Sequence, residues 1–205
     1  MRGLDALASD PHLAPIVTAH GPPPEWRRPE GFAALAYLIL EQQVSLESAA
    51  ATLLRIRDVV GDPTPRTILD AGEDRLRSSG VTRQKARYLS SLSRAFLEGF
   101  DVEGLRSLPD TEVRARLTWL DGVGRWTADV YLISSLGRPD VWPSGDRALL
   151  VATAETLGLD EVPTGAESEE IAERWRPNRT SAARILWHGY LHRRGRRPTD
   201  PLSAT

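Results

Sequence analysis

The apolar residues of this chain follow helical spacing almost throughout, and this pattern restricts the fold more than any other feature of the sequence. No segment alternates β-branched and polar residues over several strands, which is the pattern that a half-buried sheet requires. Glycine, proline and capping residues instead separate apolar helical segments. We therefore predict an all-α protein, and apolar residues make up 40% of the chain, enough for a proper core.

The longest apolar segment begins at Phe32, directly after a proline-rich connector over His20–Gly31 that cannot be helical throughout. From Phe32 the chain forms either one long helix or two helices joined near Gln43–Ser45, where Ser45 can cap the second. The other expected helices are shorter: one or two within residues 1–20, one or two within 66–79, then 83–97 capped by Thr82, a short one at 101–105, 110–119, 125–136, 147–157, 167–175 and 179–192.

The length of 205 residues suits a single domain with two helical lobes that share a core. We assign roughly residues 30–110 to one lobe and residues 111–192 to the other. The N-terminal helices, before residue 30, complete the same domain. Residues 193–205 are expected to form a flexible tail. A cleft between the two lobes is the expected place for a functional site.

The composition excludes several kinds of chemistry. The chain contains no cysteine, which excludes disulfides, thiol catalysis and an iron–sulfur cluster, and its four histidines make a transition-metal site improbable. No apolar segment approaches the length of a membrane helix and the N-terminus lacks a signal peptide, so we expect a cytoplasmic protein without a membrane partner. The net charge of −2 argues against a generally basic nucleic-acid binder but allows local phosphate binding.

Two closely spaced glycines, Gly122 and Gly124, lie between the predicted helices 110–119 and 125–136. Glycine allows positive φ and close approach of another backbone, and the amides that open the second helix point outward without partners. A phosphate is their natural acceptor, so this helix-hairpin-helix pattern predicts contact with a DNA backbone. A tight helical hairpin without a ligand explains the five residues Leu120–Gly124 equally well.

The segments around this hairpin resemble the helix-hairpin-helix (HhH-GPD) DNA glycosylases, and within them the 3-methyladenine DNA glycosylase II (AlkA-type) branch. The resemblance covers roughly residues 30–192 and is carried by four segments in order: LILEQQVSLESAA, LRSSGVTRQKARYLSSL, LDGVGRWTADVYLISSLGRPDVWPSGDRAL and AERWRPNRTSAARILWHGYL. It implies two helical lobes flanking a DNA-binding cleft. Only about 30 residues precede the matched region, so we expect the N-terminal mixed α/β subdomain of the AlkA prototype to be lacking.

The resemblance implies a monofunctional DNA glycosylase that removes alkylated bases of the 3-methyladenine and 7-methylguanine type from duplex DNA by base flipping, in base excision repair. Bifunctional relatives use a lysine just after the hairpin, where this chain has Arg125 and Trp126, and the one lysine, Lys85, lies elsewhere. We therefore expect no lyase activity. Alternatives are a glycosylase for deaminated or oxidised bases, a non-catalytic protein that binds DNA structure, and an ordinary helical interaction protein.

The resemblance makes Asp146 the expected catalytic residue, 22 residues after Gly124. A carboxylate beside the sugar can stabilise the positive charge that forms when the glycosidic bond breaks, and can orient or activate water. Asp146 also stands where an aspartate would simply cap the helix over 147–157. Asp140, in the same loop, is a weaker candidate.

Aromatic residues are expected to form the base pocket, because indole faces attract the cationic rings of alkylated purines. Trp126 and Trp187 match the pocket tryptophans of the family, and core packing is the alternative for each. Tyr37, Tyr131 and Trp142 are further candidates. Where the family prototype has tyrosines this chain has Arg147 and Val130, so the preference for a particular lesion does not carry over.

The remaining implied roles concern DNA. Gln43, and after it Gln42, stands where the family inserts a side chain into the gap left by the flipped base, although two adjacent glutamines can also be a polar step in a helix. The phosphate-binding candidates are Gly122, Val123, Gly124, Arg125 and Arg147. No cofactor is expected to be required. The backbone carbonyls of Thr118, Leu120 and Val123 correspond to a Na⁺ or K⁺ site found in the family. The expected partner is damaged double-stranded DNA, bound by a monomer.

Overall fold

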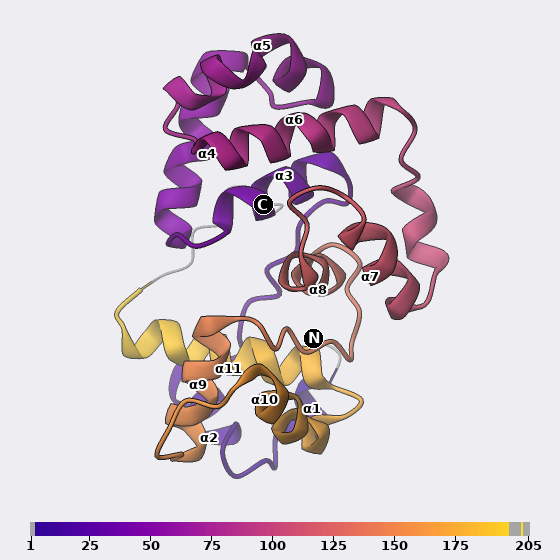
Figure 1. Cartoon of the computed structure of the whole chain (residues 1–205). Coiled ribbons are helices and arrows are strands. Elements are labelled where there is room, and N and C mark those ends of the chain that lie inside the picture. The colour runs from indigo at the N-terminus through magenta and orange to yellow at the C-terminus, as the bar shows by residue number, and fades with distance from the viewer. Residues whose placement is uncertain (1–2, 197–201, 203–205) are drawn as a thin grey trace. The chain divides into compact units, whose positions relative to one another are not determined.

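The structure is a computed structural model and describes residues 3–196 and 202. All regular secondary structure in this part of the chain is helical, and it divides into two compact units (Figure 1). We call residues 27–131 the hairpin unit, and residues 3–26 with 132–196 the aspartate unit. The boundary falls inside a helix, between Tyr131 and Leu132, and not near residue 110 as the sequence suggested.

The hairpin unit contains six complete helical elements and most of a seventh. They are α3 (Phe32–Glu41), α4 (Leu46–Val60), α5 (Pro65–Ser78), α6 (Arg83–Leu97), the 3₁₀ helix η1 (Glu103–Ser107), α7 (Asp110–Thr118) and α8 (Arg125–Ser134). In this unit α6 packs against both α5 and α3, and α4 packs against α3 and α5. The apolar α3 is buried on nearly all sides, which explains why its sequence lacks a polar face.

The chain breaks between α3 and α4, so the second of the two predicted arrangements is the observed one. Ser45 caps α4 by accepting a hydrogen bond from the amide of Ser48, as predicted. Glu41, the last residue of α3, is buried and forms an ion pair with Arg28 of the connector that precedes the helix, with 2.6 Å between the guanidinium and the carboxylate. This pair fixes the proline-rich connector against α3. Thr82 caps α6 in the way that Ser45 caps α4.

The aspartate unit is built around the long C-terminal helix. Its elements are α1 (Leu4–Leu7), α2 (Ala14–His20), α9 (Arg147–Leu157), α10 (Gly165–Ala172), the 3₁₀ helix η2 (Glu173–Trp175) and α11 (Arg179–Arg193). Helix α11 packs against α9, α2 and α1. The core of the unit includes Leu13, Leu149 and Ile185, all fully buried. Each such side chain contributes about 1.5–3 kcal/mol when removed from water.

A polar contact at Asp10 helps to tie the N-terminal segment into this core. The buried Trp175 donates its indole N–H to a carboxylate oxygen of Asp10 at 2.9 Å. The same carboxylate accepts from the amides of His12 and Leu13. Asp10 therefore joins the N-terminal segment to η2, which lies far away in the sequence.

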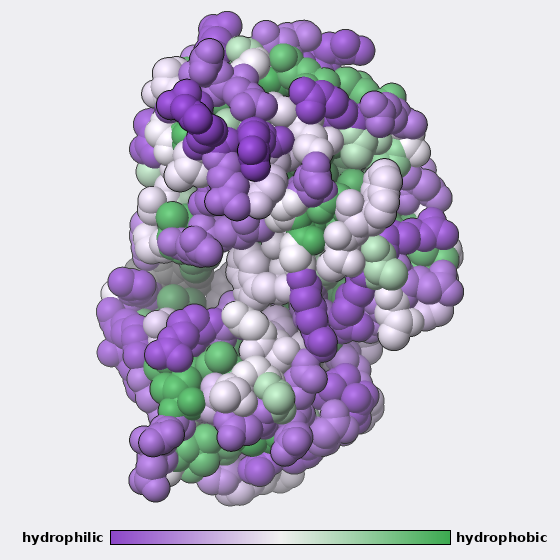
Figure 2. All heavy atoms as spheres, viewed as in Figure 1, coloured by the Kyte–Doolittle hydropathy of each residue, from purple (hydrophilic) through white to green (hydrophobic). Residues whose placement is uncertain are grey.

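The face drawn in Figure 2 is mostly hydrophilic, with smaller apolar areas among the polar side chains. None of the described helices is long and apolar enough to cross a membrane. Most of the predicted tail, residues 197–201 and 203–205, lies outside the described residues. Arg193 and Arg194 pair with Glu155, at 2.9 and 2.7 Å.

Candidate active site and nucleic-acid interface

Asp146 lies at the start of α9 in the aspartate unit. It is the N-cap of the helix, and its Oδ1 atom accepts a hydrogen bond from the amide of Leu149 at 2.8 Å. The capping role considered for it is therefore real. A carboxylate in this position also benefits from the positive end of the helix dipole. The side chain is only partly buried, so the cap leaves it accessible for a second role.

Trp187 lies beside Asp146, although 41 residues separate them in the sequence. From α11 it donates its indole Nε1–H to Oδ1 of Asp146 at 3.1 Å. Its ring also makes an edge-to-face contact with Trp26, with 6.4 Å between ring centroids. The structure thus brings together two of the predicted site residues, a carboxylate and a partly buried indole. The Trp26 contact gave no signal in the sequence.

The loop that leads to Asp146 is held by α11. Asp140 forms ion pairs with Arg176 at 2.7 Å and with Arg179 at 2.8 Å, which commits this carboxylate to a structural role. Thr180 accepts from the amide of Val141 and donates to a carbonyl of the same loop. Asp140 therefore stays the weaker of the two candidates. Arg179 and Thr180 were missed because nothing in their local sequence points to a partner 40 residues away.

Three of the predicted pocket residues are core residues in the structure, which corrects their assignment. Trp142 is buried in the aspartate unit, stacks at a tilt on Trp175 and donates its N–H to Ser168 at 2.7 Å. In the hairpin unit Tyr37 is buried beneath the guanidinium of Arg28. Tyr131 is buried too, and its hydroxyl accepts from the amide of Gly31 at 2.9 Å.

These contacts explain why the prediction failed for them. Burial raises the pKa of the Tyr131 phenol, since the charged form would lose its hydration. A ring that is buried on all sides in a core has no face left for a base. Trp126, in the first turn of α8, is partly exposed. It remains a pocket candidate.

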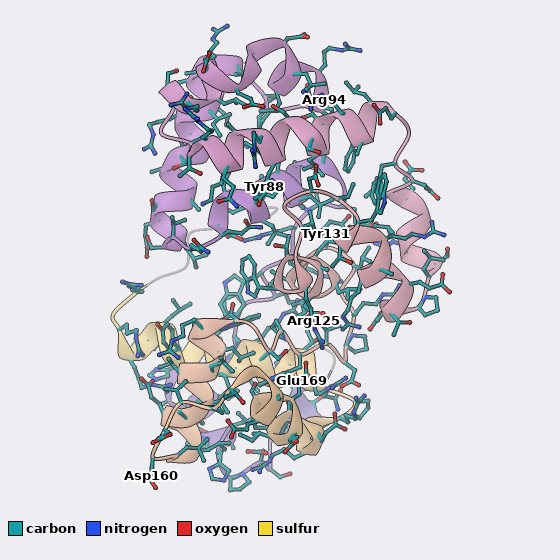
Figure 3. The ribbon with its side chains drawn as sticks, in the orientation of Figure 1. Tyr88, Arg94, Arg125, Tyr131, Asp160 and Glu169 are labelled. Carbon is teal, nitrogen blue, oxygen red and sulfur yellow. The ribbon has the colours of Figure 1, made fainter. Side chains whose placement is uncertain are left out.

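The predicted hairpin connects α7 to α8 as a tight turn. Leu120 and Val123 are buried, and the amide of Val123 donates to the carbonyl of Leu120 at 3.0 Å. Gly122 has φ +80°, and a Cβ atom added there would lie 2.3 Å from Cγ of Tyr88. Tyr88 belongs to α6, and Figure 3 labels it on that helix. Gly122 is therefore required both for its conformation and for the close packing of this ring.

Gly124 differs from Gly122. Its φ lies outside the left-handed region, and a Cβ atom there would meet nothing within 4 Å. It is exposed, as is Arg125, the first residue of α8. The start of α8 and the guanidinium of Arg125 thus lie on an accessible surface, which suits phosphate binding.

A buried carboxylate that the sequence did not reveal supports this surface. Asp129, one turn into α8, is 1% exposed and pairs with Arg114 at 2.5 Å. Its other carboxylate oxygen lies 3.7 Å from Nε of Arg125. Arg114 anchors the carboxylate, and the carboxylate in turn orients Arg125. The i to i+4 spacing of Arg125 and Asp129 was the available signal.

The two glutamines after α3 have different environments. Gln42 donates from Nε2 to the carbonyl of Gly122 at 2.7 Å and to the hydroxyl of Thr127 at 3.1 Å. It therefore links the turn to the hairpin and is not available as the inserted side chain, which corrects its assignment. Gln43 is exposed and has φ +58°. It stays the candidate for insertion.

Taken together, these features define a helix-hairpin-helix protein with a carboxylate and an indole joined by a hydrogen bond in its second unit. The chain belongs to the HhH-GPD superfamily of base excision DNA repair proteins, because the sequence model of that family matches residues 36–177. The match includes the hairpin and Asp146. The predicted family and the all-helical fold are confirmed.

The most similar relatives include enzymes that act on alkylated DNA. The chain is 29% identical to DNA-3-methyladenine glycosylase 1 of Schizosaccharomyces pombe over 180 residues, which cover 85% of this chain and 79% of the relative. The chain is also similar to the solved structure of the S. pombe 3-methyladenine DNA glycosylase in complex with abasic DNA, with a TM-score of 0.83, 28% identity and coverage of 91% of this chain and 95% of that one.

DNA-3-methyladenine glycosylase 2 of Escherichia coli is 28% identical over 167 residues. These residues cover 73% of this chain but only 54% of the E. coli enzyme. The chain thus spans about half the length of that relative.

Proposed function

We propose that this protein is a DNA glycosylase that hydrolyses the N-glycosidic bond of alkylated purines in duplex DNA. The observation that carries the proposal is the carboxylate of Asp146 with the indole of Trp187 hydrogen-bonded to it, in a chain of a base excision repair family. Relatives named 3-methyladenine glycosylases support the substrate class. The abasic DNA bound in the S. pombe structure is what such a reaction leaves behind.

In the proposed reaction the bond between C1′ of the sugar and the base nitrogen breaks. Its electron pair leaves with the base and neutralises the positive charge that alkylation gave the ring. Positive charge then develops on the sugar, where the carboxylate of Asp146 stabilises it. Water adds to C1′ and loses a proton to the carboxylate or to solvent. The products are a free methylated purine and an abasic site.

The aromatic residues suit the charge of the substrate. A methylated purine is a planar cation, and an indole face attracts cations and stacks on planar rings. Trp187 is fixed beside the carboxylate by its own hydrogen bond, so its ring is preorganised. Trp126, in the hairpin unit, is a further candidate for stacking on a base. The direct test is release of free methylated purine from duplex DNA treated with dimethyl sulfate, detected by chromatography. Absence of release with DNA binding retained would refute the proposed function.

We assign DNA backbone contacts to the hairpin. The amide of Gly124 and the guanidinium of Arg125 offer donors for a phosphate at the hairpin. Arg147, in the aspartate unit, is a separate candidate for a DNA phosphate. Such contacts position the protein without reading sequence.

We also assign a Na⁺ or K⁺ site to the same hairpin. The carbonyls of Thr118, Leu120 and Val123 would hold the ion, since carbonyl oxygens at the end of a helix lack amide partners and can replace the water around such an ion. The carbonyl of Leu120 accepts a hydrogen bond from the amide of Val123. A carbonyl oxygen has two lone pairs, so the second can face a cation. A bound cation would add positive charge near the phosphate.

We expect no strand cleavage. A lyase needs an amine that attacks C1′, and the ammonium of Lys85 is held by two backbone carbonyls at 2.7 Å. Incubation of the enzyme with its substrate and sodium borohydride should therefore trap no covalent adduct, and the product strand should break only after alkali. A bifunctional glycosylase serves as the positive control. An adduct that disappears in Lys85→Met would contradict this expectation.

Replacing Trp187 with phenylalanine should slow base release by about 10- to 100-fold, because a hydrogen bond to a charged group contributes about 1.5–3 kcal/mol. The loss should fall mainly on the single-turnover rate. Tyr190→Phe is the matched control, since Tyr190 lies on the same helix and its ring packs under Arg194. Equal effects of the two changes would show that Trp187 only fills space.

A further inference from the structure

Lys85 reaches from α6 to the end of α3. Its Nζ atom donates to the carbonyl of Leu40 at 2.7 Å and to the carbonyl of Gln42 at 2.7 Å. The last carbonyls of a helix lack amide partners and carry partial negative charge. An ammonium is therefore a fitting cap for α3. Desolvation lowers the pKa of Lys85, because burial disfavours its charged form.

The contact with the carbonyl of Gln42 bears most directly on the conformation of the turn. This carbonyl belongs to the peptide group that joins Gln42 to Gln43, so a hydrogen bond to it fixes the plane of that peptide. Gln43 itself has φ +58°, a conformation that among the described non-glycine residues only Trp26 shares. Since L residues rarely adopt this conformation, something must hold it. Lys85 does so from one side, and Gln42 holds the turn from the other side through Gly122.

The choice of lysine at this position is informative. The chain has 26 basic residues, and all except Lys85 are arginines. A guanidinium is planar and broad, whereas an ammonium is compact and can point two of its three N–H groups at neighbouring carbonyls. The one lysine of the chain thus stands where a single cation contacts two carbonyl oxygens, those of Leu40 and Gln42.

We propose that Lys85 is a positioning residue for base extrusion, which holds the 42–44 turn so that Gln43 can fill the gap left by the flipped base. This inference rests on the proposed function. Flipping costs unstacking and unpairing energy, and a displaced insertion residue would no longer offset it. Lys85 then affects the opening of the stack and leaves bond cleavage itself unchanged.

The absence of cysteine permits a sharp test. In Lys85→Cys the introduced thiol is the only one in the chain, so 2-bromoethylamine converts it to a side chain with an ammonium at nearly the length of lysine. Iodoacetamide gives a neutral side chain of similar size. Both proteins come from one preparation, and thermal melts show whether each is folded.

The first readout is single-turnover release of 7-methylguanine from two duplexes. In one the lesion pairs with cytosine; in the other it faces an abasic site, which lowers the cost of flipping. On the paired duplex the neutral protein should be slower than wild type by about 10- to 100-fold, and the aminoethylated protein should recover. On the second duplex the loss should shrink to about threefold or less. Equal losses on both duplexes, or no recovery, would overturn the proposal.

A second variant connects the effect to Gln43. Gln43→Ala should show the same dependence on the opposing base, and adding Lys85→Met to it should bring little further loss, because both changes remove one function. Full additivity would contradict the proposal. Arg87→Met is the charge control, since Arg87 is exposed on the same helix; it should leave both rates unchanged.

The third readout does not depend on activity. Hydrogen exchange in the free protein should be about tenfold faster over residues 42–45 in the neutral protein than in the aminoethylated one, with the amide of Val123 unchanged. Unchanged exchange over 42–45 would overturn the role of Lys85. If wild type released no base from either duplex while this exchange pattern held, the proposed function would fail and the positioning of the turn would stand.

Discussion

Replacing Asp146 with asparagine should lower the single-turnover rate of base release by about 10³-fold and leave folding and DNA affinity unchanged. Asparagine is as good an N-cap as aspartate, and its side-chain oxygen can still accept from the amide of Leu149 and the indole of Trp187. The substitution therefore removes the negative charge and little else. Base release from methylated duplex, a thermal melt and a DNA-binding titration together check the expectation.

Two further substitutions make that result specific. Asp146→Ala removes the cap as well as the charge, so it should also lower the free energy of unfolding by about 1 kcal/mol. Asp140→Asn changes the other carboxylate of the loop, which pairs with Arg176 and Arg179, and should cost stability more than chemistry. If Asp146→Asn kept its activity, Asp146 would be only a cap.

Gly122→Ala should be the most damaging change in the hairpin. A left-handed conformation costs a residue with a Cβ about 1–2 kcal/mol, and overpacking a filled site costs about 1–3 kcal/mol. Both apply at Gly122, with φ +80° and a Cβ position 2.3 Å from the ring of Tyr88. We expect a clear fall in melting temperature, at about 2–4 °C for each kcal/mol, and loss of DNA binding.

Gly124→Ala is the matched control in the same five residues. Nothing lies within 4 Å of its Cβ position and its φ is unexceptional, so the melting temperature should stay within about 1 °C of wild type because no clash or strain is introduced. Its DNA affinity should still fall, since the methyl group would occupy the place of an approaching phosphate. A large loss of stability in Gly124→Ala would mean that the hairpin needs both glycines for folding.

Helix positions were the most predictable part of the fold. The bounds of α6 and α9 match the prediction because Thr82 and Asp146 mark their starts and apolar spacing marks their length. The break after Glu41 was left open by the sequence, since Ser45 signals a cap but a polar residue inside a helix looks the same. Local signals settle where helices begin and end.

Partner choice was not predictable in the same way. Gln42 and Gln43 are identical in type and adjacent, yet one donates to Gly122, some 80 residues away, and the other is exposed. Trp142 and Trp187 look alike in the sequence, and only the first is satisfied inside a core, by Ser168. The difference lies in tertiary contacts between residues far apart in the sequence, and such contacts do not show in the spacing of apolar residues. The family resemblance predicted Asp146 and Trp187, which the structure joins by a hydrogen bond, but nothing in it indicates the ion pair of Asp129 or the two carbonyl contacts of Lys85.

The hydrogen bond from Gln42 to Gly122 has a consequence for how such a protein would search DNA. It joins the turn that carries Gln43 to the turn that we assign to phosphate binding, within one unit. The distance from the gripped phosphate to the tested base pair is then set by the protein and does not vary with local DNA shape. Each step along the backbone would present the next base pair at the same spacing, so undamaged pairs would be rejected by their resistance to opening and not by failed alignment.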